Sequence, residues 1–152
     1  MRKRKIIIII IAAILLCIML MAFFGNPVVL INGYKLGNAV KNVSTDTIAL
    51  NEITPFDWDI AYSFMPYTSK KEIESVIGFG SNEIIETVSE GMVQLIFVKE
   101  NKVVCNIQGY SSNLGYSISI WKGAEQYCLV KIEDDISLSV DRRDNIVFLV
   151  RN

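Results

Sequence analysis

The sequence predicts an α+β protein, in which an N-terminal transmembrane helix precedes an antiparallel β-meander sheet with one short helix packed on it. Three observations predict this class. Uncharged apolar residues run from Ile6 to Phe24, one helical spacing follows near residues 70–77, and alternating apolar segments fill the rest. One helix followed by several short strands is typical of an antiparallel sheet that carries the helix on one face.

The N-terminal segment combines a basic tip, residues 1–5, with the apolar run over residues 6–25. At about 1.5 Å per residue, such a helix is long enough to cross a hydrocarbon core of about 30 Å. The basic tip predicts a single-pass signal-anchor in the cell membrane, with a cytoplasmic N-terminus and an extracytoplasmic C-terminal domain. A cleaved signal peptide and a lipoprotein signal at Cys17 are alternatives, which the long run and the bulky Leu16 disfavour.

The remaining chain is expected to hold a stalk and one domain. Pro27 should end the membrane helix, and glycines with polar residues indicate an irregular stalk or linker over residues 26–54. The extracytoplasmic α+β domain is expected over residues 55–152. Four of the 15 basic residues and none of the 16 acidic ones lie in the tip, so residues 26–152 have a net charge of −5. This acidic balance gives no support for nucleic-acid binding.

From Pro55 onward, alternation of apolar and polar residues predicts strands. Ser69 and Glu72 fit a capping box, and Gly78 suits a left-handed helix end, so a short helix is expected over about residues 70–77. Residues 81–90 fit either a helical turn or a strand. The first strand has the alternating aromatic and apolar residues Trp58, Ile60, Tyr62 and Phe64. The later strands are expected near 91–98, 103–108, 114–120, 127–132, 136–140 and 146–150.

The side-chain inventory excludes several kinds of chemistry. The sequence has no histidine, which removes the commonest general base and the commonest metal ligand. We therefore name no catalytic residue, metal ligand or cofactor. Cys105 and Cys128 lie in apolar strand-like runs, which favours buried free thiols. A disulfide between them stays open, because the sequence does not give the distance between their Cα atoms.

The densest group of candidate binding residues lies between residues 56 and 67. Asp57 and Asp59 are two positions apart on a strand, so their carboxylates face the same way and could share a proton or a cation. The structural alternatives are a solvated strand face for the acids and a core stripe for the aromatic residues. Trp121 shares a polar face with two serines and could be exposed. The candidate binding residues are Asp57, Trp58, Asp59, Tyr62, Pro66, Tyr67 and Trp121.

The stretch from Pro55 to Ser69, continuing to Gly78, resembles a segment of small Gram-positive bacterial proteins that are membrane-anchored or lipoproteins. Those proteins share a W-D…Y-x-F-x-P-Y pattern followed by a short helix and a glycine. The resemblance covers about 25 of the 152 residues. It implies a bacterial extracytoplasmic α+β domain of unassigned function and supplies no catalytic residues. The chain lacks a proper lipobox, which favours a helical anchor.

Two function classes remain after these exclusions. The first is a binding or interaction module at the cell envelope, with the membrane and a cell-envelope protein as partners; an edge strand of the meander would offer backbone pairing to a peptide. The alternative is a carboxylate-dependent extracellular hydrolase that acts on glycans. Its acid and base would be Asp57 and Asp59, or the 133–135 acidic cluster, which is otherwise expected to form a turn.

Overall fold

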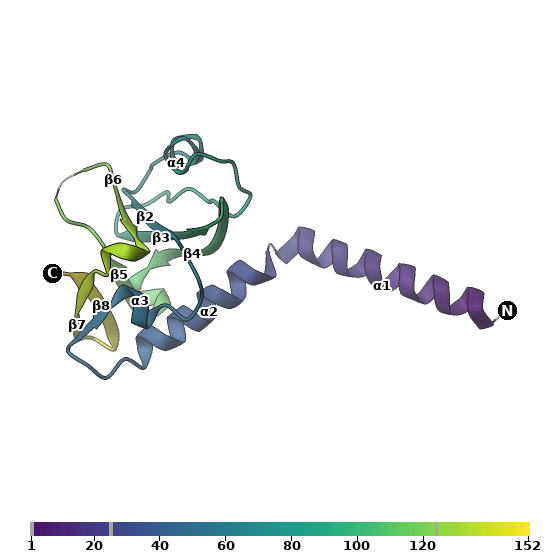
Figure 1. Ribbon diagram of the computed structural model, residues 1–152, viewed down its shortest axis with the longest axis horizontal. Helices are drawn as coiled ribbons and strands as arrows, with labels where there is room; N and C mark the ends of the chain where they lie inside the picture. The colour runs from purple at the N-terminus through teal and green to yellow at the C-terminus, as the bar shows by residue number, and fades with distance from the viewer. Residues whose placement is uncertain (1, 25, 124) are drawn as a thin grey trace.

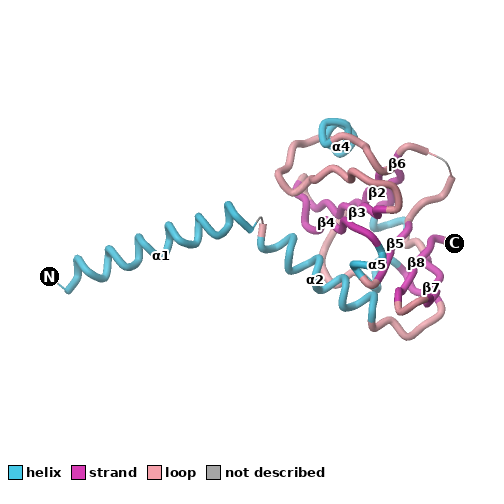
Figure 2. Tube along the Cα trace, turned by 180° about the vertical axis from the view of Figure 1, so that it is seen from behind, coloured by secondary structure: helices cyan, strands magenta, loops and turns pink. Residues whose placement is uncertain are grey.

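The computed structural model describes residues 2–24, 26–123 and 125–152, with the side chains of residues 2, 3, 17 and 20–24 outside this description. Figures 1 and 2 show two sheets with helices beside them. Sheet A consists of β1 (Thr47–Ala49), β7 (Ser137–Arg143), β8 (Ile146–Arg151) and β5 (Tyr116–Ser119). Sheet B consists of β4 (Lys102–Tyr110), β3 (Met92–Lys99), β2 (Ile60–Phe64) and β6 (Tyr127–Lys131). The helices are α1 (Arg2–Phe24), α2 (Pro27–Lys41), α3 (Leu50–Ile53), α4 (Lys70–Ile77), α5 (Ser111–Leu114) and the 3-10 helix η1 (Ile132–Asp134).

The α+β class is observed, but the prediction of one antiparallel meander with one helix is wrong. The chain forms two sheets and crosses between them several times. It passes, for example, from β5 in sheet A to β6 in sheet B and returns to sheet A at β7. Within sheet A, β5 pairs with β8 in parallel, from Tyr116 opposite Val147 to Ser119 opposite Val150. Alternation in the sequence predicts strands but does not say which strands pair, so it could not give this topology.

The prediction of a transmembrane signal-anchor is also corrected. Within the part of the chain that the structure describes, no helix combines the length and the apolar character needed to cross a membrane. The predicted location as a single-pass cell-membrane protein with a cytoplasmic N-terminus depended on that span and is withdrawn with it.

Residues 26–54, which we expected to form a stalk, fold into α2, β1 and α3. The Oδ1 atom of Asn26 accepts a hydrogen bond from the Val28 N–H at 3.0 Å, and Pro27 occupies the first turn of α2. Proline is well suited to that position, because the N–H that it lacks has no partner within the helix. Leu36 and Leu50, from α2 and α3, are fully buried. The folded unit therefore includes residues well before Pro55.

Both faces of sheet B are covered. On one face, Phe97 of β3 joins Leu138 and Leu149 of sheet A in a buried cluster. On the other face, Ile96 of β3 lies in a second cluster with Ile73 of α4, and Figure 1 shows α4 above the sheet. For this reason β2 is buried along almost its whole length, whereas its alternating sequence predicted a half-buried strand.

The helix predicted over residues 70–77 is confirmed as α4, and so is its capping box. The Ser69 Oγ accepts a hydrogen bond from the Glu72 N–H at 3.3 Å, and the Glu72 Oε2 accepts one from the Ser69 N–H at 2.9 Å. Gly78 ends the helix at φ 92°, in the left-handed region that glycine adopts without steric cost. Local side-chain signals were sufficient here, because helix caps involve residues close in sequence.

The segment between α4 and β3 is irregular, and side-chain amides of sheet B hold it in place. Gln94 donates from Nε2 to the carbonyl oxygen of Ile85 at 2.8 Å. Asn106 donates from Nδ2 to the carbonyl oxygen of Glu83 at 2.7 Å. These amides satisfy backbone groups that a strand or helix would otherwise pair. Within residues 81–90, for which the sequence fitted either a helical turn or a strand, the structure has a turn at 82–83 and irregular backbone over 84–88.

The close packing of α2 on β5 at Gly37 predicts that a larger side chain there destabilises the fold. A Cβ atom at Gly37 would lie 3.0 Å from Cε1 of the buried Tyr116 ring, so Gly37→Val should lower the free energy of unfolding by about 1–3 kcal/mol. A Cβ at Gly33 meets Ile107 Cδ1 at 3.7 Å, an ordinary contact, so Gly33→Ala should raise it by about 0.5–1 kcal/mol. Urea denaturation measures both, and equal stabilities of the two variants would contradict this packing.

Glu72 predicts a pH-dependent contribution to stability. Hydrogen bonds from the side chain and the backbone N–H of Ser69 hold the pKa of Glu72 below its usual value. A carboxyl group with a lowered pKa stabilises the fold fully above its unfolded pKa, and that stabilisation is lost as the pH falls through its folded pKa. The stability difference between wild type and Glu72→Gln should therefore be larger at pH 7 than at pH 3, by urea denaturation. The exposed Glu90→Gln serves as the control, and a difference for Glu72→Gln that is constant with pH would contradict the cap.

Candidate functional site

Asp57 and Asp59 lie at the surface, beside the turn between β3 and β4. The Asp57 side chain is 87% exposed, and its Oδ2 lies 3.3 Å from Lys99 Nζ. The Asp59 Oδ2 accepts a hydrogen bond from the Glu100 N–H at 2.8 Å. Glu100 and Asn101 both have positive φ, 48° and 58°, so this turn benefits from such support. The Asp59 carboxylate therefore supports the turn, whereas the exposed ion pair of Asp57 with Lys99 contributes little to stability.

Trp58 and Tyr62, which the sequence placed on one face, lie on opposite faces of sheet B. The regular strand begins only at Ile60, so the parity of Trp58 does not carry over. Trp58 is 2% exposed and packs edge-on against Phe97, with ring centroids 5.4 Å apart. Tyr62 is buried on the α4 side, where burial, and then the nearby Tyr127, raise its pKa. Neither ring is available at the surface to a ligand.

Pro66, Tyr67 and Trp121 do reach surface hollows. Pro66 borders two of them, Tyr67 borders one, and Trp121 borders the other. Tyr67 is exposed and has φ 68°, and its N–H donates to the carbonyl oxygen of Thr87 at 2.9 Å. The structure thus divides the candidate residues into two buried rings, two exposed acids beside a turn, and three residues beside hollows.

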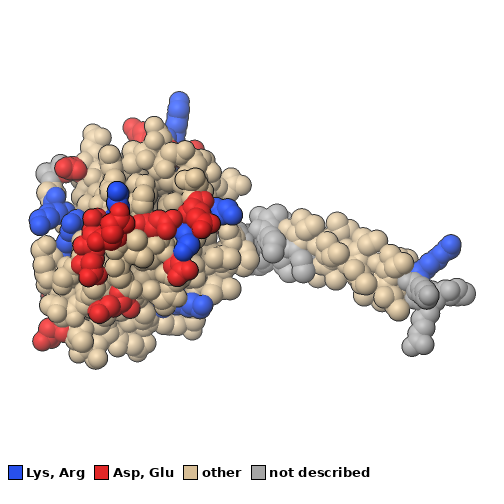
Figure 3. Space-filling view, in the orientation of Figure 1, with Lys and Arg blue, Asp and Glu red and all other residues tan. Residues whose placement is uncertain are grey.

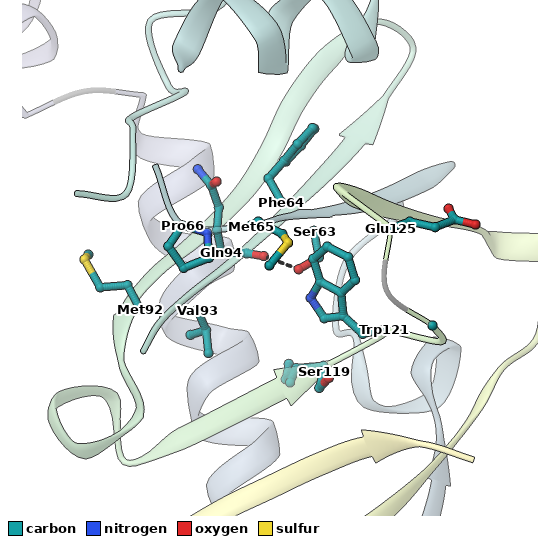
Figure 4. Close-up of a pocket in the computed structure, with 12 residues that line it drawn as sticks. Ser63, Phe64, Met65, Pro66, Met92, Val93, Gln94, Ser119, Trp121 and Glu125 are labelled. Atoms are coloured by element: carbon teal, nitrogen blue, oxygen red, sulfur yellow. Dashed lines mark hydrogen bonds between the residues drawn. The ribbon is translucent and has the colours of Figure 1, made fainter. Parts of the chain in front are cut away.

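The first hollow, which we call the Trp121 cavity, has a volume of about 330 Å³ (Figure 4). It lies where β2 and β3 of sheet B approach β5 of sheet A. Met65, Val93 and Trp121 contribute apolar walls. Ser63 and Gln94 contribute neutral polar groups to the lining, and Ser63 Oγ donates a hydrogen bond to the carbonyl oxygen of Gln94 at 2.8 Å. Glu125 is the ionisable member of the described lining.

The second hollow, which we call the α4 groove, has a volume of about 510 Å³ and lies between α4 and the ends of β2 and β6. Residues 64–66 border both hollows. In the groove, Phe64 stacks on Tyr127 with ring centroids 6.0 Å apart, and Val76 of α4 provides an apolar wall. Glu72 supplies the carboxylate of the described lining.

Sequence reasoning missed most of the Trp121 cavity. It selected Pro66 and Trp121 but not Met65, Met92 or Val93, which come from segments far apart in the chain. The signal that found Trp121 was an aromatic residue on a strand face that was otherwise polar. A similar signal did not exist for the methionines and the valine, since an apolar residue in a strand is ordinarily interpreted as core.

Acidic side chains gather on the face of the molecule that Figure 3 shows. The carbonyl oxygen of Asp59 accepts a hydrogen bond from the Ile132 N–H at 2.9 Å, so η1 adjoins the β3–β4 turn. The predicted turn at residues 133–135 is confirmed, and Asp134 Oδ2 accepts the Lys131 N–H at 2.8 Å. Among the described residues, no group of three or more His, Cys, Asp or Glu side chains could hold a metal ion.

Cys105 and Cys128 are both free thiols. Cys105 is buried, and desolvation raises the pKa of its thiol to about 12. Cys128 is half-buried, and its Sγ donates to the carbonyl oxygen of Ile120 at 3.2 Å. The disulfide that the sequence left open is therefore absent between these two residues.

The burial of Cys105 predicts its reactivity. Because the thiolate is the reactive form, alkylation of Cys105 by iodoacetamide at pH 8 should be at least about 100-fold slower in the native protein than in urea. Cys128 should be alkylated in the native protein. Peptide mass mapping distinguishes the two sites, and rapid native alkylation of Cys105 or recovery of a Cys105–Cys128 disulfide would contradict the structure.

Comparison of the chain with known proteins does not extend these observations. No protein-family model, curated protein or solved structure matches the sequence or the fold. The resemblance to small Gram-positive proteins stays a prediction, and the assignment of function depends on the geometry of the two hollows.

Proposed function

We propose that this protein is a binding module that receives an apolar group of its partner in the Trp121 cavity. The observation that carries the proposal is the cavity itself, whose volume of about 330 Å³ is within the range of ligand pockets, roughly 300–1,000 Å³. Its apolar walls and small number of polar groups are also typical of such sites. The proposal does not include a cell-envelope partner, because that expectation depended on the membrane span.

The walls of the cavity indicate which group would bind there. Met65 and Met92 have flexible, polarisable thioethers that adapt to an apolar surface and make favourable contacts with aromatic rings. The ring of Trp121 lies beside Ser63 and Met65 in Figure 4 and can stack on a second ring. Glu125 in the lining disfavours an anion. A neutral aromatic or branched aliphatic group, such as a side chain of a partner protein, matches these walls.

The same geometry gives no support to the hydrolase alternative. Glycoside hydrolysis uses two carboxyl groups on either side of the scissile bond. Asp57 and Asp59 border neither hollow, and both are exposed. Glu125 alone supplies a carboxylate to the described lining of the Trp121 cavity. The described lining therefore lacks the second carboxyl group that glycoside hydrolysis needs, whereas binding of an apolar group needs no group that the lining lacks.

Removal of the Trp121 ring tests the proposal. With the full-length protein and the neutral fluorophore N-phenyl-1-naphthylamine, Trp121→Ala should raise the dissociation constant at least about tenfold, because one aromatic wall is lost. The control is Tyr34→Ala, since Tyr34 is 73% exposed on α2 and borders neither hollow. Thermal unfolding confirms that both variants are folded.

The comparison of the two variants also accounts for fluorophore that binds elsewhere, including on the exposed apolar residues of α1. Such binding contributes equally to wild type, Trp121→Ala and Tyr34→Ala. Identical saturable binding in wild type and Trp121→Ala would show that the cavity does not take up an apolar group, and would overturn the proposal.

A further inference from the structure

The two edges of sheet B differ in whether their backbone is covered. At the β4 edge, α2 lies alongside the strand, and Asn32 Nδ2 donates to the carbonyl oxygen of Val104 at 2.9 Å. At the opposite edge, β6 pairs with β2 on one side. Proteins usually protect an edge strand with charge, a bulge, a proline or a covering element, because its free N–H and C=O groups can pair with another chain.

The hydrogen bonds at the two ends of β6 show which of its residues face outward. The Met65 N–H donates to the Gln126 carbonyl at 3.2 Å, and the Ile132 N–H donates to the Asp59 carbonyl at 2.9 Å. Since antiparallel pairing alternates, Tyr127 and the alternate residues after it direct their backbone groups away from β2.

The outward N–H groups of β6 are open at Tyr127 and Leu129, and the Leu129 carbonyl oxygen accepts a long contact of 3.9 Å from Cys128 Sγ. Among the described residues, neither N–H donates a hydrogen bond. The next outward N–H, that of Lys131, donates to Asp134 Oδ2 at 2.8 Å. The side chains of Tyr127 and Leu129 are 37% and 42% exposed, and Tyr127 borders the α4 groove. This edge therefore carries apolar side chains where a protected edge carries charge.

We propose that β6 accepts an extended, basic segment of a partner protein as an added antiparallel strand. The carboxylates at the two ends of the strand favour basic side chains: Glu125 precedes β6, and Glu133 and Asp134 follow it. Lys131 lies within β6, and its Nζ is 3.7 Å from Glu133 Oε1. The inference rests on the proposed function in taking the protein to be a binding module. It uses the backbone edge of β6, which adjoins the Trp121 cavity at Glu125 but does not line it.

The pairing geometry specifies the partner further. Residues directly opposite Tyr127 and Leu129 would exchange N–H···O=C bonds with them, and their side chains would lie on the α4 side of the sheet. Those side chains should be apolar, since they extend the exposed apolar surface beside the α4 groove. The alternate residues of the partner strand would carry the basic side chains on the other face. Their own N–H groups would point away from β6.

N-methylated peptides test this geometry without changing the protein. The probe is a fluorescein-labelled seven-residue peptide of alternating valine and lysine, titrated into the full-length protein. N-methylation of the valines should weaken binding at least about tenfold, because it removes the N–H groups that face β6. N-methylation of the lysines should leave the affinity unchanged within about threefold, since those N–H groups face away. A matched peptide with glutamate in place of lysine should bind at least about tenfold more weakly.

Two readouts on the protein locate the peptide. Hydrogen exchange of the Tyr127 and Leu129 amides should slow in the complex, because both would become hydrogen-bonded. Leu129→Pro removes an outward N–H that β2 does not use, so it should abolish peptide binding while the sheet is retained. Leu129→Ala, which keeps the N–H, should still bind.

Three results would overturn the inference. The first is that the valine–lysine peptide does not bind at concentrations up to about 1 mM. The second is that N-methylation of the valines and of the lysines weakens binding equally. The third is that ultracentrifugation shows a dimer of the protein that Leu129→Pro dissociates. The last result would make a second copy of the chain the occupant of the edge. A failure of the fluorophore to bind at Trp121, together with protection of the β6 amides, would overturn the cavity proposal alone.

Discussion

Burial of sheet B on both faces is the constraint on which the other features of the molecule depend. Phe97 packs edge-on against both Phe56 and Trp58 at 5.4 Å, while its neighbour Ile96 is buried beneath α4. A sheet enclosed in this way cannot present a face to a partner, so its ends and edges are the places left for binding. One edge is closed by α2, and the open end and the open edge meet near Met65 and β6.

The parts of the fold that the sequence predicted are those set by nearby residues. The α4 helix followed from Ser69, Glu72 and Gly78, which lie within ten residues of one another. The α2 helix was missed because proline can follow one helix or begin the next, and only the packing of Leu36 distinguishes the two. The parallel pairing of β5 with β8 was missed because strand partners depend on contacts between distant segments.

The residues of the candidate site likewise fall into those that the sequence could identify and those that it could not. Trp121 was found because an aromatic ring on a polar strand face is unusual, and it does border the cavity. Asp57 and Asp59 attracted attention by their spacing, but Asp59 accepts a hydrogen bond from the β3–β4 turn and Asp57 makes an exposed ion pair with Lys99. Other carboxylates also accept backbone N–H groups at turns and helix starts, as Asp134 does at Lys131 and Glu86 at Lys70. The described lining of the Trp121 cavity has Glu125 as its one carboxylate. Met65 could not be recognised, since its role arises only when β2 and β5 are brought together.

The side-chain amides that hold the segment before β3 limit which of its positions tolerate substitution. Gln94, Asn106 and Gln108 all bond to carbonyl oxygens, at Ile85, Glu83 and Glu86 respectively. A carbonyl oxygen is the same whichever side chain its residue carries. Position 85, whose side chain is 60% exposed, can therefore change in charge, size or polarity while its attachment to the sheet is preserved. Glu83 and Glu86 are more constrained, because their carboxylates also accept hydrogen bonds from the Asn26 and Lys70 N–H groups, which lie at the starts of α2 and α4. The segment beside α4 thus offers one surface position, residue 85, whose chemistry can diverge between related proteins at little cost to the fold, flanked by two carboxylates that the helix starts require.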